Sequence, residues 1–126
     1  MKYLLVVRDS FAAAHRLVGS GGRCENLHGH NFKVELKVGG DHLDDSGMLL
    51  DFTDLKNTLK VILSNLDHRD LNELSPFAES SPSSEKIAEY VFQSAREVLD
   101  SGSVNVVSVT VSESDTASAT YRPGQN

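Results

Sequence analysis

Residues 28–38 carry two alternating sets of side chains, and this alternation constrains the fold more than any other feature of the chain. One set is apolar or aromatic apart from two histidines: His28, His30, Phe32, Val34, Leu36 and Val38. The set between them is polar: Asn31, Lys33, Glu35 and Lys37. Successive side chains of a β-strand point to opposite faces, so the segment predicts a strand with one buried face. His28 and His30 belong to that buried face.

Other segments are also expected to be strands. Residues 3–15 carry apolar side chains at most odd positions, so His15 falls in phase with the apolar face of this strand. Residues 104–113 alternate valine with polar residues and place Val107 in the apolar phase. A short last strand is expected over residues 117–121. These segments are expected to join residues 28–38 in one sheet.

Two segments show the spacing of amphipathic helices. The first is expected to begin with Thr53 as its capping residue, and its apolar positions then recur every three or four residues. The second is expected to begin after Ser83 or Ser81, to bury a stripe that ends in Val98, and to stop at Gly102. The order β-β-α-α-β-β predicts an α+β fold, an antiparallel sheet with two helices on one face.

The edges of this sheet predict an oligomer. Long antiparallel strands leave rows of unpaired hydrogen-bonding groups at the sheet edges, and proteins normally pair or shield such rows. Pairing between identical subunits would close the sheets into a ring and remove the edges. We therefore expect an oligomeric barrel.

Length and charge limit the classes of partner. A chain of 126 residues is expected to form a single domain over residues 1–126. Lys and Arg number 12 against 18 Asp and Glu, which disfavours nucleic acid and membrane surfaces because both are bound through basic patches. The apolar run at residues 3–7 is too short for a signal peptide, and a single cysteine, Cys24, fits a reducing compartment. The expected location is the cytoplasm.

Three histidines in strand phase form a candidate metal site. His28 and His30 project from one strand face about 7 Å apart along the backbone, and His15 lies in the same phase of a neighbouring strand. Three neutral imidazoles would leave one position of a tetrahedral zinc ion open for water or substrate, as in catalytic zinc sites. A chance His-Gly-His in a turn is the alternative, and the third histidine disfavours it. His42, in a loop-like stretch, is expected to be solvated.

Cys24 lies four residues before His28, on the loop that enters the strand. Near a dication or an imidazolium its thiol would ionise readily and could act as a base or nucleophile. A lone cysteine is more commonly a buried structural residue. In a third interpretation its sulfur fills the fourth zinc position and gives a closed Cys-His₃ site.

Two other groups of polar residues also have alternative interpretations. Asp67 and His68 would form a proton relay if the carboxylate fixed the imidazole tautomer, which requires an irregular turn because neighbours in a regular helix do not meet. Alternatively, they end the first helix and His68 favours its negative end. Glu113 could accept two hydrogen bonds from a planar N–H/NH₂ edge of a heterocycle, or it could mark the point where the strand enters solvent.

Six segments, taken in this order, resemble one known family. They are Phe11-Ala12-Ala13-Ala14-His15, Cys24-x-x-x-His28-Gly29-His30, Gly47-Met48-Leu49-Leu50-Asp51-Phe52, Leu66-Asp67-His68-x-x-Leu71-Asn72, Pro82-Ser83-Ser84-Glu85, and Val111-Ser112-Glu113 through Tyr121. Each segment alone is weak, but their joint order is specific and covers nearly the whole chain. The family is that of the 6-pyruvoyltetrahydropterin synthases and the bacterial 6-carboxy-5,6,7,8-tetrahydropterin synthases.

The resemblance implies the tunnelling fold, in which subunits join their sheets into a barrel and two trimers stack as a homohexamer. It also implies one zinc ion per subunit, held by His15, His28 and His30. The active sites are then expected to lie between subunits.

The resemblance further implies a catalytic triad of Cys24 with Asp67 and His68, the latter two from a neighbouring subunit, and Glu113 as the anchor of a pterin ring. The implied substrate is a small molecule, 7,8-dihydroneopterin triphosphate. The bacterial reaction gives 6-carboxy-5,6,7,8-tetrahydropterin, acetaldehyde and triphosphate, for queuosine and related deazapurines. The animal-type branch keeps the side chain as a 6-pyruvoyl group.

Glu25 introduces an alternative product. It follows Cys24, so the loop also reads Glu-x-x-His-Gly-His, which resembles family members that cleave the side chain to 6-hydroxymethyl-7,8-dihydropterin for folate synthesis. Glu25 is then a possible alternative base, and a solvated loop acid is the plainer interpretation. A zinc- or pterin-binding subunit with the closed Cys-His₃ site is the non-enzymatic alternative.

Overall fold

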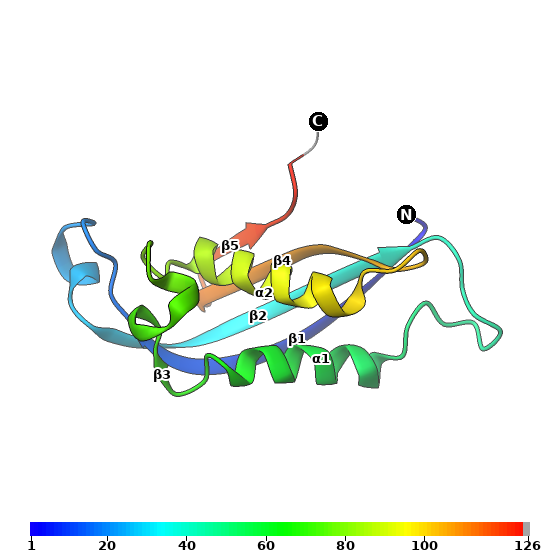
Figure 1. The fold of residues 1–126 in the computed structure, drawn as a ribbon, viewed down its shortest axis with the longest axis horizontal. Helices are drawn as coiled ribbons and strands as arrows, with labels where there is room; N and C mark the ends of the chain where they lie inside the picture. Colours follow the sequence, from blue (N-terminus) through cyan, green and yellow to red (C-terminus); the bar gives the residue numbers. More distant parts are fainter. Residues whose placement is uncertain (125–126) are drawn as a thin grey trace.

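The computed structural model describes residues 1–124. Its long strands and helices follow the expected order (Figure 1). The strands are β1 (Tyr3–His15), β2 (His28–Gly40), β3 (Arg69–Asp70), β4 (Asn105–Ser114) and β5 (Ala117–Tyr121). The helices are α1 (Phe52–Ser64) and α2 (Ser84–Leu99), with short 3₁₀ turns η1 (Gly22–Glu25), η2 (Leu71–Glu73) and η3 (Ser75–Phe77). Only the two-residue β3 and the 3₁₀ turns were not expected from the sequence.

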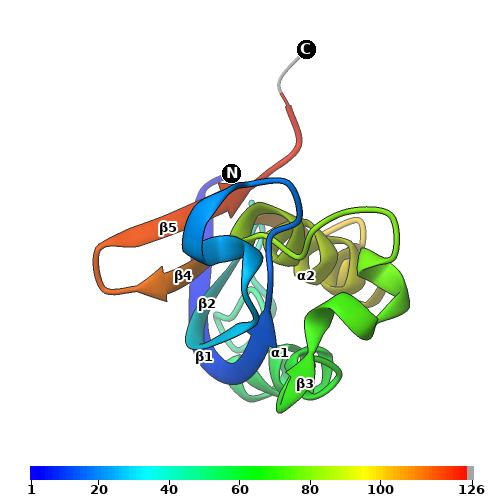
Figure 2. The same ribbon diagram turned by 90° about the vertical axis from the view of Figure 1, so that its left-hand side faces the viewer.

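The sheet has the order β3-β1-β2-β4-β5, and its long strands are antiparallel. Figure 2, which views the molecule end-on, shows α1 and α2 on the same side of the sheet. The core fills the space between these two layers and consists of aliphatic and aromatic side chains such as Phe32, Leu36, Leu59, Ile87 and Phe92. The expected α+β fold with two helices on one face is therefore confirmed.

Strands β1 and β2 pair without a bulge along all thirteen residues of β1. Their buried side chains match across the ladder, as in Val7 opposite Leu36 and Phe11 opposite Phe32. The Phe11 and Phe32 rings stack with their centroids 5.0 Å apart. This register places the far end of β1 directly beside the start of β2.

The helix ends differ in detail from the prediction. Asp51, not Thr53, caps α1, because the Asp51 carboxylate accepts a hydrogen bond from the Thr53 amide at 2.7 Å. At the other helix, Ser83 is the cap of α2, as one of the two expected alternatives. However, α2 ends at Leu99 rather than at Gly102, because Asp100 leaves the helical conformation and its carboxylate accepts from the Val106 amide at 2.8 Å.

Two apolar positions were assigned to the wrong face. Val98 was expected in the buried stripe of α2, but its side chain is 67% exposed, and Ala88 and Phe92 lie in the core instead. In β4 a register shift opposite Lys37 and Val38 leaves Val107 as an extra residue. Val106 and Ser108, on either side of this extra residue, are both buried. The valines of β4 therefore do not alternate regularly through Val107 as predicted.

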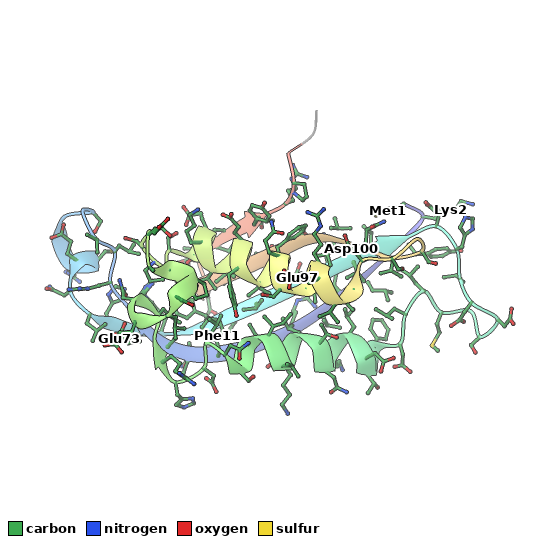
Figure 3. The ribbon with its side chains drawn as sticks, viewed as in Figure 1. Met1, Lys2, Phe11, Glu73, Glu97 and Asp100 are labelled. Atoms are coloured by element: carbon green, nitrogen blue, oxygen red, sulfur yellow. The ribbon has the colours of Figure 1, made fainter. Side chains whose placement is uncertain are left out.

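The two ends of the sheet have different surroundings. Met1 and Lys2 lie at one end of the molecule and Glu73, at the end of η2, lies at the other (Figure 3). The loop that contains η1 also projects beyond the sheet at the Glu73 end (Figure 1). The histidines of β1 and β2 belong to this end. Neither α-helix within residues 1–124 combines the length and the apolar character that a membrane span requires.

Replacing Gly40 by alanine is expected to destabilise the fold by about 1–3 kcal/mol. Strand β2 continues through Gly40, two residues past its expected end, and a Cβ there would collide with the backbone carbonyl of Ser103. The measurement is the free energy of unfolding in urea. Gly102→Ala is the matched control, because a Cβ at Gly102 meets open space, and a change of less than about 1 kcal/mol is expected there. Equal effects of the two substitutions would contradict the prediction.

Candidate functional site

The register of β1 and β2 brings together His15, His28 and His30, here called the histidine cluster. His15 lies directly opposite His28, and His30 lies opposite Ala13. Since side chains two residues apart share a strand face, the three imidazoles project to the same side of the sheet. One ring nitrogen from each histidine lies within 4.8 Å of the others. The structure therefore places these three residues together as the strand phases predicted.

His15 is oriented by a hydrogen bond on one side of its ring and has no partner on the other. Its Nδ1 donates to the carbonyl oxygen of Pro82 at 2.7 Å, which leaves the lone pair on Nε2. The side chain is 0% exposed, and Nε2 has no hydrogen-bond partner among residues 1–124. A buried acceptor without a partner costs about 1–3 kcal/mol. A metal ion bound to Nε2 would remove that cost.

The surroundings of His15 favour its neutral form. Burial is the main influence and lowers the pKa of His15, while the hydrogen bond to Pro82 and the carboxylate of Glu113 act in the opposite direction. His28 and His30 lower the pKa further. A neutral imidazole is the form that binds metal ions.

His28 has the same arrangement as His15. His28 Nδ1 donates to the carbonyl oxygen of Asn26 at 2.7 Å, so its Nε2 also carries a free lone pair. Phe32 forms an apolar floor beneath the cluster, with its ring centroid 5.3 Å from His15 and 5.4 Å from His30. Nitrogen ligands held by outer hydrogen bonds to carbonyl oxygens are typical of protein metal sites. These residues fit a metal ion, and three imidazoles suit zinc.

Cys24 and Glu25 lie in η1, outside the histidine cluster. Cys24 is exposed, so the interpretation as a buried structural cysteine is wrong. The group of metal-ligating atoms found among residues 1–124 contains the three histidines and not the Cys24 sulfur. The Cys24 carbonyl accepts from the Leu17 amide at 2.6 Å, which anchors η1 two residues beyond His15. Glu25 is used within the loop, where its Oε1 accepts from the Gly21 amide at 2.9 Å.

The Asp67–His68 pair lies in an irregular turn after α1. The helix already ends at Ser64, so the interpretation of the pair as the helix end is wrong. His68 has a φ of 58°, in the left-handed region, and this conformation lets its Nδ1 approach Asp67 Oδ2 at 3.0 Å. The relay geometry that required an irregular turn is therefore present within one chain.

The Asp67–His68 pair is also fixed to β1. Asp67 Oδ1 accepts from the Ala12 amide at 2.9 Å, and the His68 amide donates to the Ala12 carbonyl at 2.6 Å. The first of these bonds, followed by the hydrogen bond with His68, lowers the pKa of Asp67 below its usual range. The His68 side chain is 82% exposed, and it lines a hollow of about 550 Å³ together with His30 and Arg69.

Glu113 lies on the other side of the histidine cluster. Its Oε1 is 3.7 Å from His15 Nε2, and its side chain is one-third exposed rather than fully solvated. It lines a cavity of about 350 Å³ between the start of α2 and β5, with Ser84 and Ser118 among the other lining residues. The histidine cluster thus adjoins both hollows, since His30 lines the one that contains His68 and Glu113, which lines the other, lies 3.7 Å from His15.

Ser84 is a polar residue of this cavity to which the sequence had assigned no role. Its Oγ is buried and has no hydrogen-bond partner among residues 1–124. The signal was available, because Ser84 shares the helical spacing of the buried residues Ile87, Val91 and Ala95. A serine in a buried stripe that is not the helix cap indicates either a packing role or a ligand.

This sheet topology, with two helices on one face, is that of a tunnelling-fold protein. A cluster of three histidines lies where its first two strands meet and forms a candidate metal site. The sequence profile of the family described as "6-pyruvoyl tetrahydropterin synthase" matches residues 4–124. The chain therefore belongs to the 6-pyruvoyl tetrahydropterin synthase family, and the expectation of an enzyme of the lyase class is confirmed.

Individual relatives agree with this assignment. The 6-carboxy-5,6,7,8-tetrahydropterin synthase of Synechocystis is 38% identical over 124 residues, which cover 94% of this chain and 92% of that protein. The Bacillus subtilis protein of the same name is 36% identical over 110 residues, covering 82% and 73%. The solved structure of Caenorhabditis elegans 6-pyruvoyl tetrahydropterin synthase superposes with a TM-score of 0.86 at 30% identity, covering 97% of this chain and 96% of that chain.

Proposed function

We propose that this protein is a zinc-dependent lyase that converts 7,8-dihydroneopterin triphosphate and one water molecule into 6-carboxy-5,6,7,8-tetrahydropterin, acetaldehyde and triphosphate. The observation that carries the proposal is the buried, unpartnered Nε2 of His15, which lies beside two further imidazoles and 3.7 Å from Glu113. The names of the Synechocystis and Bacillus relatives favour the 6-carboxy product. The product would serve as a precursor of queuosine and related deazapurines in the cytoplasm.

The metal would be held by His15, His28 and His30 through the nitrogens that face one another. When bound, zinc supplies a Lewis acid that lowers the pKa of substrate hydroxyl groups. The carbonyl oxygens of Pro82 and Asn26 fix the tautomers of His15 and His28 and so keep the ligating lone pairs available.

Glu113 and Ser84 would recognise the pterin ring. A carboxylate can accept two parallel hydrogen bonds from the N–H and NH₂ groups of a pyrimidinone edge, which fixes the plane of the ring. Ser84 offers a further polar atom in the same cavity, and a ligand would satisfy its unpartnered hydroxyl. The cavity of about 350 Å³ is within the range of small-molecule sites. This arrangement would leave the substrate side chain directed toward the histidine cluster.

Cys24 and the Asp67–His68 pair would move protons. The Cys24 thiolate would remove a proton from the substrate side chain, and its backbone is anchored to Leu17, which also lines the Glu113 cavity. Asp67 holds Nδ1 of His68, so His68 Nε2 is free to give or accept a proton. The rearrangement is an internal redox and elimination reaction, so no nicotinamide is needed.

The proposed assembly is a homohexamer, a dimer of trimers, with each site between subunits. The outer edge of β1 is paired only at Ala13 and Ala14 within residues 1–124, and β5 is the other edge of the sheet. These edges support pairing with further copies of the chain. In such an assembly the Asp67–His68 pair would serve the histidine cluster of a neighbouring subunit.

Product analysis by mass spectrometry tests the proposed reaction. Incubation of the zinc-loaded protein with 7,8-dihydroneopterin triphosphate is expected to give 6-carboxy-5,6,7,8-tetrahydropterin and acetaldehyde as the major products. A 6-pyruvoyl product would assign the animal-type reaction instead. A 6-hydroxymethyl product would assign the cleavage reaction that Glu25 could support. Zinc-loaded protein that leaves the substrate unchanged would contradict the proposal.

A further inference from the structure

The side chain of Asn72 pairs with the backbone of β1 immediately after His15. The Arg16 amide donates to Asn72 Oδ1 at 2.9 Å, and Asn72 Nδ2 donates to the Arg16 carbonyl at 3.0 Å. The carboxamide thus satisfies both backbone groups of Arg16, as a residue of a paired strand would. The effect is to continue the pairing at this edge from Ala14, the last partner of β3, to Arg16, two residues further along the chain.

Asn72 is itself held in place. Its amide donates to Asp70 Oδ1 at 3.1 Å, and Asp70 caps the 3₁₀ turn η2 in which Asn72 lies. Asp70 also pairs with Ala14 through β3. The carboxamide is therefore attached to a short, ordered turn rather than to a free loop.

Residues 67–72 form one clamp on β1. Its first part holds both backbone groups of Ala12, through Asp67 Oδ1 and the His68 amide. Its middle is β3, and its last part is the Asn72 carboxamide on Arg16. His15, a candidate metal ligand, lies between these attachments. The clamp therefore connects the segment that carries His15 to the Asp67–His68 pair through hydrogen bonds to the backbone of residues 12–16.

We propose that Asn72 is a positioning residue for the candidate metal centre. By holding Arg16, it fixes the end of β1 and therefore the His15 ring, which must keep its Nδ1 on the Pro82 carbonyl and its Nε2 toward His28 and His30. This inference rests on the proposed function in one respect only, namely that the histidine cluster binds a metal ion. Asn72 touches neither substrate nor metal in this role.

The position of Asn72 explains why its loss would matter. Beyond Arg16 the chain enters the exposed loop that contains η1. The Leu17 amide bonds within this loop, to the Cys24 carbonyl, and the next attachment to the rest of the fold is the Val18 amide on Ser81 Oγ at 2.9 Å. Without Asn72, the outer edge of β1 would be unattached from Ala14 to Val18. Displacement of His15 would then misalign a candidate ligand whose ring is otherwise held through Nδ1 on the Pro82 carbonyl. Groups that orient metal ligands typically affect affinity by about 10–100-fold.

The test is zinc affinity, measured by competition with a chromophoric chelator at a temperature at which circular dichroism shows each variant folded. Asn72→Leu keeps a similar volume and removes both hydrogen bonds, and it is expected to weaken zinc binding about tenfold. Asn57→Ala is the matched control, because Asn57 is exposed on α1, and wild-type affinity is expected. Asn72→Asp keeps the acceptor for the Arg16 amide but not the donor, so an intermediate loss is expected.

A second readout separates positioning from general stabilisation. Zinc should raise the melting temperature of wild type by more than that of Asn72→Leu, because an ion that is bound with lower affinity stabilises the folded protein less. If Asn72 only supports the fold, its replacement would lower the melting temperatures of the zinc-free and the zinc-loaded protein equally. The zinc-induced shift would then be unchanged.

Wild-type affinity in folded Asn72→Leu, or an unchanged zinc-induced shift, would overturn the inference. If Asn72→Leu does not fold, the zinc affinity of Asn72→Asp is the deciding measurement. Wild-type affinity in that variant would overturn the inference. Failure of the wild-type chain to bind zinc would overturn both this inference and the proposed metal site. Since no measurement here uses the pterin substrate, an error in the proposed reaction alone would leave these results unchanged.

Discussion

Replacement of His28 by alanine is expected to weaken zinc binding by more than about 100-fold and to abolish turnover. Loss of a direct ligand should exceed the effect of losing an outer hydrogen-bond partner, for which 10–100-fold is typical. His28 is the appropriate position because it is only partly buried, whereas removal of the fully buried His15 would also open a cavity in the core. The measurements are zinc stoichiometry after dialysis and steady-state turnover of the pterin substrate.

His42→Ala provides the control for this substitution. His42 is exposed in the loop between β2 and α1, so its removal should leave zinc content and turnover unchanged. Full zinc occupancy with wild-type affinity in His28→Ala would exclude the three-histidine centre.

Replacement of Cys24 by alanine is expected to lower turnover by about 10²–10⁴-fold while zinc content stays the same. The range is that of a general base, and zinc should be retained because the Cys24 sulfur is outside the group of metal-ligating atoms. The measurements are turnover, by product formation, and the metal content of the same preparation. Loss of zinc in this variant would instead support the closed Cys-His₃ site.

Glu25→Gln is the matched control for Cys24→Ala. The amide oxygen of glutamine can still accept the hydrogen bond from Gly21, so the loop should keep its conformation. Turnover close to wild type is expected, with the same product. If Glu25→Gln lost activity while Cys24→Ala kept it, the base would be Glu25 and the assignment of Cys24 would be wrong.

Strand periodicity predicted the most important part of the site. The phases of residues 3–15 and 28–38 placed His15, His28 and His30 on one face, because each strand has a buried face that tolerates no shift of register. The periodicity of the two segments could not show that they pair with each other or that His15 lies opposite His28. Both facts depend on the register between the strands.

Features that depend on irregular backbone could not be settled from the sequence, which left an irregular turn at Asp67 and His68 as one of two interpretations. The turn at His68 needs a positive φ, which no sequence pattern around Asp67 and His68 indicated. The role of Asn72 arises from contacts with Arg16, 56 residues earlier in the chain. Ser84 could have been detected from its place in the buried stripe of α2, but a capping role for its neighbour Ser83 hid that signal. Local sequence patterns predict which face of a helix or strand is buried. Contacts between residues far apart in the chain can be seen only in the folded structure.

The uninterrupted pairing of β1 and β2 holds the candidate metal ligands, whereas the candidate bases lie in the loop outside it. One added or lost residue within either strand would turn the histidines beyond it to the opposite face, so the candidate metal centre cannot change in small steps. The connection that carries Cys24 and Glu25 has no such restriction, since it lies outside the ladder. A scaffold of this kind could exchange its proposed base, and with it the proposed product, without any change to the candidate metal site.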